Sequence, residues 1–249
     1  MLNYEVTVML RVHSIETFGT HEGPGIRLVV FLQGCNFRCL YCHNPDTQSL
    51  EGGVELKSKH IIEFLEKQRP YFKNKGGLTV SGGEPLMQRE DLIDLFRKAK
   101  KLGFNIALDT QGSIFDEHTR KLLKFVDLVL LDVKHIDLEW HKKVTGNANI
   151  GTLKTAKYLL DTKIPMWLRY VLVPGLTDQE EFLHKWGEHF KDYTNIERVE
   201  ILPFHTFGFY KYKELGVKNP LENTPVPTKE QVQKAFEIFK QYFREVYIR

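Results

Sequence analysis

The sequence QGCNFRCLYCHN, residues 33–44, contains all three cysteines of this 249-residue chain, Cys35, Cys39 and Cys42. An odd number of closely spaced cysteines argues against a disulfide framework and leaves the thiols free to bind metal. His43 completes a four-ligand set for zinc, although zinc ligands usually come from two separated knuckles, whereas Cys42 and His43 are adjacent. The segment CLYCH also matches the haem c attachment pattern, but that interpretation leaves Cys35 unused.

An iron–sulfur cluster is the interpretation that these thiols favour. Such a cluster ordinarily takes four cysteine thiolates. Three thiolates on a four-iron cluster leave one iron open to another molecule, and an open iron is a reaction site. The spacing therefore favours a [4Fe-4S] centre at which chemistry takes place.

The composition predicts one globular domain over residues 1–249, located in the cytoplasm. Hydrophobic residues make up 42% of the chain, which is enough for a sizeable core. The net charge is only +3, with both signs interspersed, so no basic surface for nucleic acid is indicated. Because Glu5, Arg11 and His13 interrupt the first apolar run, and no later run is long enough to span a bilayer, we expect neither a signal peptide nor a membrane helix.

Strand-like and helix-like segments alternate along the chain. Short apolar runs predict six strands, at Ile26–Leu32, Leu78–Val80, Asn105–Leu108, Val126–Leu131, Trp167–Val173 and Val199–Leu202. Helical periodicity lies between or after them, at 61–65, 92–102, 122–125, 153–160, 182–190 and 232–243. Repeated βα units indicate a parallel sheet, either doubly wound or in a partly open barrel.

Two helices are expected to begin with capping boxes, at Thr177–Glu180 and Thr228–Gln231. The polar segment Lys211–Pro227 has no periodicity, and we expect a long loop there that contacts a partner.

Polar residues gather where the predicted strands end. Since the carboxyl ends of parallel barrel strands meet at one face, which carries the active site in such barrels, we expect these residues to share one site. For Lys134 and His135 a solvated surface position is an equally good interpretation. The residues are Cys35, Cys39, Cys42, Gly82, Gly83, Glu84, Asp109, Thr110, Asp132, Lys134, His135 and His205.

The cysteine segment resembles the signature of a known superfamily. CNFRCLYC has the C-x3-C-x2-C spacing of the radical S-adenosylmethionine (SAM) enzymes, with an aromatic residue before the last cysteine. The longer string GPGIRLVVFLQGCNFRCLYCHN resembles the glycyl-radical-enzyme activases, followed in order by SGGEP, LDTQG, LDVKH, RYVLVPG and LPFH. The resemblance implies an α/β fold, a partial, open (β/α)6 barrel, with Cys35, Cys39 and Cys42 holding a [4Fe-4S] cluster.

The resemblance also implies the residues that bind ligands. It implies that Glu22 contacts the substrate, although the family usually has Asp there. A monovalent cation, Na or K, is implied at Asp109, Thr110, the Leu130 carbonyl and Asp132. From the residues alone, the alternative is that the two carboxylates form ion pairs with Lys or Arg. SAM is implied to contact Tyr41, Cys42, His43, Gly82, Gly83, Glu84, Asp132, Val133, Lys134 and His205.

The implied reaction is reductive cleavage of SAM to methionine and a 5′-deoxyadenosyl radical, which removes a hydrogen from a glycine of a partner enzyme. Related activases carry an additional cysteine-rich module, and Cys42 is the last cysteine here, which favours pyruvate formate-lyase as the partner. We expect a monomer reduced by flavodoxin or a ferredoxin-type protein. Alternatives are another glycyl-radical enzyme or a small molecule as substrate, or a zinc- or cluster-bearing binding module without turnover.

Overall fold

The computed structural model describes residues 8–249 and contains one nine-stranded sheet in the order β3-β1-β2-β4-β5-β6-β7-β8-β9. The six predicted strands form its central part and run parallel to one another. Their bounds are Arg27–Leu32 (β2), Gly77–Gly82 (β4), Asn105–Thr110 (β5), Leu128–Asp132 (β6), Met166–Leu172 (β7) and Ile196–Pro203 (β8). Because β3 and β9 end the sheet without pairing with each other, the barrel is open, as predicted.

Three strands at the sheet edges were not predicted. β1 (Met9–Gly19) is antiparallel to β2, β3 (Val54–Lys57) is antiparallel to β1, and β9 (Val246–Ile248) is parallel to β8. β1 is long and mixed in polarity, whereas β3 and β9 are short and mostly exposed. Apolar runs therefore do not mark them, because one face or both faces are in contact with water.

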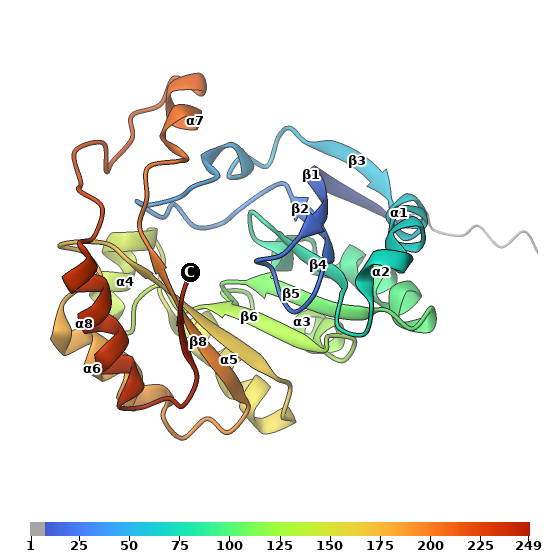
Figure 1. Cartoon of the computed structure of the whole chain (residues 1–249). Helices are drawn as coiled ribbons and strands as arrows, with labels where there is room; N and C mark the ends of the chain where they lie inside the picture. The colour runs from blue at the N-terminus through green and yellow to red at the C-terminus, as the bar shows by residue number, and fades with distance from the viewer. Residues whose placement is uncertain (1–7) are drawn as a thin grey trace, which may run out of the picture.

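Helices cover the outer side of the curved sheet (Figure 1). Six correspond to predicted helices: α1 (Ser58–Phe72), α2 (Arg89–Lys101), α3 (Glu117–Leu123), α5 (Ile150–Thr162), α6 (Glu180–Phe190) and α8 (Lys229–Lys240). α4 (Leu138–Thr145) and α7 (Phe209–Glu214) were not predicted, and short 3-10 turns lie at Pro45–Thr47 (η1) and Pro85–Gln88 (η2). The prediction of a loop over Lys211–Pro227 is wrong for its first four residues, which belong to α7.

One of the two predicted capping boxes is present. Thr228 and Gln231 cap α8 reciprocally through their side chains. The other is wrong, because α6 begins at Glu180 and no side chain caps it. The Thr177 hydroxyl instead donates to the Val171 carbonyl at 2.7 Å and accepts from the Val173 amide at 2.7 Å, so it braces the end of β7.

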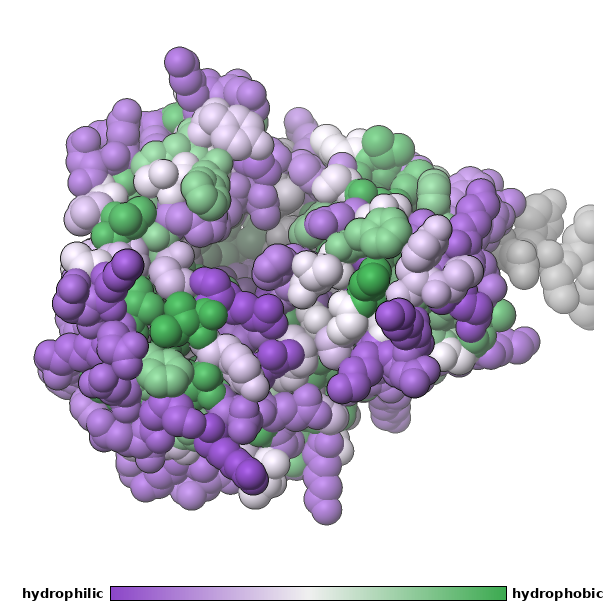
Figure 2. All heavy atoms as spheres, in the orientation of Figure 1, coloured by the Kyte–Doolittle hydropathy of each residue, from purple (hydrophilic) through white to green (hydrophobic). Residues whose placement is uncertain are grey.

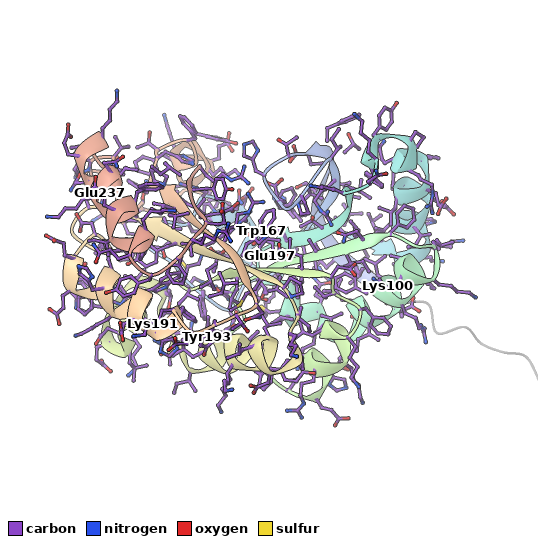
Figure 3. The ribbon with its side chains drawn as sticks, turned by 60° about the horizontal axis from the view of Figure 1, so that its bottom comes forward. Lys100, Trp167, Lys191, Tyr193, Glu197 and Glu237 are labelled. Atoms are coloured by element: carbon purple, nitrogen blue, oxygen red, sulfur yellow. The ribbon has the colours of Figure 1, made fainter. Side chains whose placement is uncertain are left out.

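The two faces of the central strands differ in polarity. Alternate residues such as Leu78, Val80 and Leu131 belong to the main core, which also contains buried residues of the covering helices. The opposite face points into the barrel, where Ala107, Leu128, Leu130 and Trp167 form a small apolar floor. Trp167 and Glu197 lie side by side in Figure 3, and the indole N–H donates to the carboxylate at 2.9 Å. With this floor packed, the barrel interior is accessible from the other end, where the strands terminate.

Within residues 8–249, every helix is too short or too polar to cross a lipid bilayer.

Candidate active site

A cavity of about 340 Å³ lies at the carboxyl ends of the parallel strands. The surface view shows the molecule hollowed near the centre of this face (Figure 2). Most of the predicted site residues line the cavity, so the structure brings them together in space. The lining includes Glu22, Cys35, Cys39, Tyr41, Cys42, His43, Gly82, Gly83, Asp109, Thr110, Asp132 and Lys134, whereas Glu84, Leu130, Val133, His135 and His205 lie outside it.

The loop that carries the cysteines is fixed by backbone hydrogen bonds to distant segments. The Gly34 amide donates to the Thr47 carbonyl at 2.8 Å, and the Arg38 amide donates to the Thr145 carbonyl at 2.8 Å. The second bond uses a carbonyl at the end of α4, which would otherwise lack a partner in the helix. The cysteine loop is thus held in shape before any ligand binds.

The three thiols are free and partly buried. Burial raises the pKa of Cys35 to about 11 and that of Cys39 to about 12, so neither is a thiolate on its own at neutral pH. A metal centre supplies the positive charge that favours the thiolate form. The thiols therefore suit a cationic cluster.

Zinc fits this geometry less well. In the described part of the chain, no three His, Cys, Asp or Glu side chains converge on one metal-ion position. A structural zinc ion requires such convergence, whereas a four-iron cluster offers each thiolate a separate iron.

Gly82 and Gly83 let β4 end against the cysteine loop. A Cβ on Gly82 would lie 2.2 Å from the Leu32 amide nitrogen, and one on Gly83 would lie 2.2 Å from the Gly34 carbonyl oxygen. Gly82 also has a φ of +113°. Close backbone packing therefore accounts for both glycines, which in addition line the cavity.

Glu84 is fully engaged by the protein. Its carboxylate accepts from the Thr110 hydroxyl at 2.5 Å, the Leu86 amide at 2.9 Å and the Gln111 amide at 3.0 Å. Burial raises the pKa of Glu84 to about 7, while these hydrogen bonds act in the opposite direction. In this structure Glu84 joins the end of β4 to the end of β5; its contact with SAM stays a prediction.

Ion pairs balance the carboxylates of the cavity. Asp132 lies 3.0 Å from the Lys134 ammonium, and Asp109 lies 3.1 Å from the Arg169 guanidinium. Burial lowers the pKa of Lys134, but attraction to Asp132 outweighs it and holds the pKa above its usual range. Lys134 is thus charged and largely buried, and His135 is fully buried, so the interpretation as solvated surface residues is wrong for both.

One oxygen of Asp109 remains free. Its Oδ2 atom accepts from Ser81 at 2.8 Å and from Arg169, whereas its Oδ1 atom is buried and has no partner among the described residues. Such an orphaned anionic oxygen is costly unless a cation or donor reaches it.

His43 and His205 lie together at one side of the cavity. Their rings stack with centroids 3.9 Å apart, and His43 Nε2 lies 3.1 Å from the His205 carbonyl oxygen. His205 is thus in direct contact with the cysteine loop although it follows β8.

Arg169 and Ser81 also line the cavity, although neither was predicted as a site residue. Each is a polar residue within a strand identified by its apolar neighbours. A polar residue inside an apolar strand could have indicated a site residue, because a buried polar group inside a barrel needs a specific partner.

Comparison with known proteins identifies the family. The model of the radical SAM superfamily matches residues 29–186. The pyruvate formate-lyase-activating enzyme of Staphylococcus epidermidis is 44% identical, covering 90% of this chain and 93% of that protein. The enzyme of the same name from Streptococcus mutans is 45% identical, covering 94% and 92%. The chain belongs to the radical SAM superfamily.

Solved structures of two other proteins share the fold. Streptococcus suis SuiB bound to S-adenosylmethionine matches with a TM-score of 0.65 at 15% identity, over 95% of this chain and 51% of SuiB. A domain of the pyruvate-formate lyase-activating enzyme from Bacteroides vulgatus matches with a TM-score of 0.59 at 24% identity, over 70% of this chain and 99% of that domain. Membership of the radical SAM superfamily implies a [4Fe-4S] cluster and SAM, and the only three thiols of the chain line the cavity.

Proposed function

We propose that this protein activates pyruvate formate-lyase by removing a hydrogen atom from one of its glycines. The observation that carries the proposal is the 44–45% identity to activating enzymes over at least 90% of both chains, combined with three thiols in one cavity. When bound and reduced, the cluster and SAM supply a 5′-deoxyadenosyl radical for that step. The chain's own residues bind and orient these ligands and exclude water from them.

We assign SAM to the cavity beside the cysteines. Lys134 and Arg169 provide buried positive charge suited to a carboxylate, and Asp132 provides an acceptor suited to an ammonium group. The stacked rings of His43 and His205 provide an aromatic surface suited to an adenine. The proposed SAM-binding set is Tyr41, Cys42, His43, Gly82, Gly83, Glu84, Asp132, Val133, Lys134 and His205.

A monovalent cation, K or Na, is proposed next to this ligand. The orphaned Oδ1 of Asp109 supports it, since a cation there would neutralise a buried oxygen. The strand register supports it too, because Asp109 lies opposite Leu130, whose carbonyl is the third proposed ligand. Thr110 and Asp132 complete the set.

The partner's glycine segment is proposed to enter the same cavity and to contact Glu22. Glu22 lines the cavity from the loop that precedes β2. The open barrel leaves an entrance at the strand ends that an extended peptide requires.

Electron paramagnetic resonance of pyruvate formate-lyase mixed anaerobically with this protein, SAM and reductant tests the function. We expect a glycyl radical signal and 5′-deoxyadenosine. Cleavage of SAM without a partner radical would favour another glycyl-radical enzyme or a small-molecule substrate. No cleavage at all by protein with an intact cluster would contradict the radical assignment.

The cysteine ligands are tested in the same assay. Replacing Cys35, Cys39 or Cys42 with Ala is expected to abolish cluster binding and SAM cleavage, because each thiolate holds one iron. Iron content and 5′-deoxyadenosine yield measure this. Ser49→Ala, at an exposed serine just beyond the cysteine loop, is the control and is expected to behave as the wild type. One cysteine variant with full activity and an intact cluster would disprove the ligand set.

The other sequence-based expectations belong to the same proposal. They are a flavodoxin or ferredoxin-type reductant, a monomeric state, a single domain over residues 1–249 and a location in the cytoplasm.

A further inference from the structure

A buried arginine joins three separate parts of the barrel. Arg169 of β7 donates from Nε to Glu200 at 3.0 Å, from Nη1 to Asp109 at 3.1 Å and from Nη2 to the His21 carbonyl at 2.5 Å. These bonds reach β8, β5 and the loop before β2. Because the guanidinium is planar and its donors point in fixed directions, all three bonds form only if the side chain is held in one orientation.

Glu200 holds Arg169 on one side and a second arginine on the other. Its side chain is fully buried, and its Oε1 atom accepts from Arg249 Nε at 3.0 Å and Nη2 at 2.8 Å. β9 pairs with β8 so that Tyr247 lies opposite Glu200, and the Arg249 amide donates to the Ile201 carbonyl. Pairing of β9 with β8 thus places the Arg249 guanidinium where it donates to the Oε1 atom of Glu200.

The loop held by Arg169 has no regular structure of its own. Residues 20–26 lie between β1 and β2 and belong to no helix or strand. Arg169 holds the His21 carbonyl, and the Thr79 hydroxyl donates to the next carbonyl, that of Glu22, at 2.7 Å. Two adjacent carbonyls are therefore held by two different strands, β7 and β4, and Glu22 lines the cavity.

We propose that Glu200 and Arg249 are positioning residues that act through Arg169 to hold the loop of residues 20–26 for the incoming glycine segment. The inference rests on the proposed function. Neither residue lines the cavity. They fix a guanidinium whose third bond sets the place of Glu22. Loss of Arg249 removes both hydrogen bonds to Glu200 Oε1 and leaves that oxygen only the more distant Arg198, at 3.6 Å. The Glu200–Arg169 pair can then shift, which loosens the loop without removing any group from the cavity.

Arg249→Gln tests the proposal with the least risk to folding, because the Arg249 side chain is 28% exposed at the sheet edge. We expect the KM for a glycine peptide of the partner to rise about tenfold while kcat changes less than twofold. Because Arg169 also lines the cavity assigned to SAM, the Kd for SAM is measured as well and is expected to rise less than this KM. Arg249→Lys restores part of the KM, since one ammonium donor still reaches Glu200. Arg244→Gln is the control: it makes the same charge change two residues before β9, and the described residues give its side chain no hydrogen-bond partner.

Hydrogen exchange measures the opening of the loop directly and requires neither substrate nor activity. In Arg249→Gln the amides of residues 20–26 are expected to exchange at least fivefold faster than in the wild type, and in Arg244→Gln at the wild-type rate. Unchanged exchange together with unchanged KM overturns the proposal. Faster exchange throughout the sheet also overturns it, because it indicates general destabilisation. Should the wild type form no partner radical, the proposed function fails, while the exchange result still decides whether Arg249 positions the loop.

Discussion

Asp109, Asp132 and Glu200 each pair with a cation of the protein, but one oxygen of Asp109 stays without a partner among the described residues. Asp132 pairs with Lys134, and Glu200 pairs with Arg169 and Arg249. Asp109 has only one of its two oxygens satisfied among the described residues. Since a buried charge without a full set of partners is costly, the free oxygen marks where an additional cation would have the largest effect.

Neutralising Asp109 or Asp132 is therefore expected to weaken SAM binding about tenfold and to reduce the response of activity to potassium or sodium. Equilibrium binding of SAM to Asp109→Asn and Asp132→Asn at several concentrations of each salt measures this. Asp161→Asn, at an exposed helical position, is the control and should retain wild-type affinity. Unchanged affinity in both cavity variants would leave these residues with ion pairing as their only role.

His135 makes stability depend on pH. It is fully buried between Trp140 and Phe182, and burial lowers its pKa to about 4 from the ordinary 6.5. The unfolded chain then binds the proton more readily, so stability present above pH 6.5 is lost as the pH falls toward 4.

Between pH 8 and pH 5.5 this histidine is expected to cost about 1 kcal/mol of unfolding free energy. His135→Phe keeps an aromatic ring and removes the titration, so its stability should fall less over the same range. Anaerobic urea unfolding of both proteins at the two pH values measures the difference. Equal losses in the two proteins would show that His135 does not titrate differently on folding.

The cysteines were singled out by their spacing and by the resemblance that it carries, because the three residues lie close together in sequence. Arg169 and Glu200 were not, since each was counted within an apolar strand and the two lie 31 residues apart. Their pairing depends on β7 and β8 being neighbours in register, with Arg169 opposite Glu200. A local pattern carries no information about that register.

Connections between strand and helix depend on which backbone groups a capping side chain meets in the folded chain. TDQE at 177–180 and TKEQ at 228–231 resemble each other, yet only the second caps a helix. Thr177 is fully buried, and its hydroxyl bonds to two backbone groups of the segment that leaves β7. The central strands and long helices were predictable from periodicity, whereas α4, α7 and the edge strands are short or exposed and left little signal.

The two threonines are expected to respond differently to loss of the hydroxyl. Thr177→Val keeps the shape but leaves the Val171 carbonyl and the Val173 amide without a partner, which should cost about 2–3 kcal/mol of unfolding free energy. Thr228→Val removes an exposed cap and should cost about 1 kcal/mol. Chemical unfolding midpoints of both variants measure this, with Thr177→Ser as the control that keeps the hydroxyl. A larger loss at Thr228 would refute the bracing role of Thr177.

At the scale of the whole molecule, the described residues close one end of the barrel and leave a cavity at the other. Trp167 and its apolar neighbours fill the floor, and the sheet stays open between β3 and β9. The cavity with the three thiols lies at the other end, where the strands stop. A glycine delivered to this cavity must therefore come on a segment that can leave its own fold and extend into the entrance.

A folded partner is thus expected to bind less tightly than its own isolated glycine segment. When only a fraction of partner molecules has the loop released, the apparent affinity falls by that fraction, and a short peptide copying the loop avoids the opening step. Such a peptide should support 5′-deoxyadenosine formation at concentrations below those needed for the folded partner. A Gly→Ala peptide should support much less, since the methyl group crowds the cavity and changes the hydrogen presented.

Peptide labelled with deuterium at the α-carbon of the glycine provides the measurement. Because the transferred atom ends on the 5′-carbon, deuterium must appear in 5′-deoxyadenosine when the labelled peptide is used and must be absent with unlabelled peptide. Label only in the Gly→Ala reaction, or in neither, would mean that the glycine is not the hydrogen donor. If, in addition, pyruvate formate-lyase gained no radical signal, activation of that enzyme would be excluded, and SAM cleavage at the three cysteines would still have to serve another substrate that reaches the same cavity.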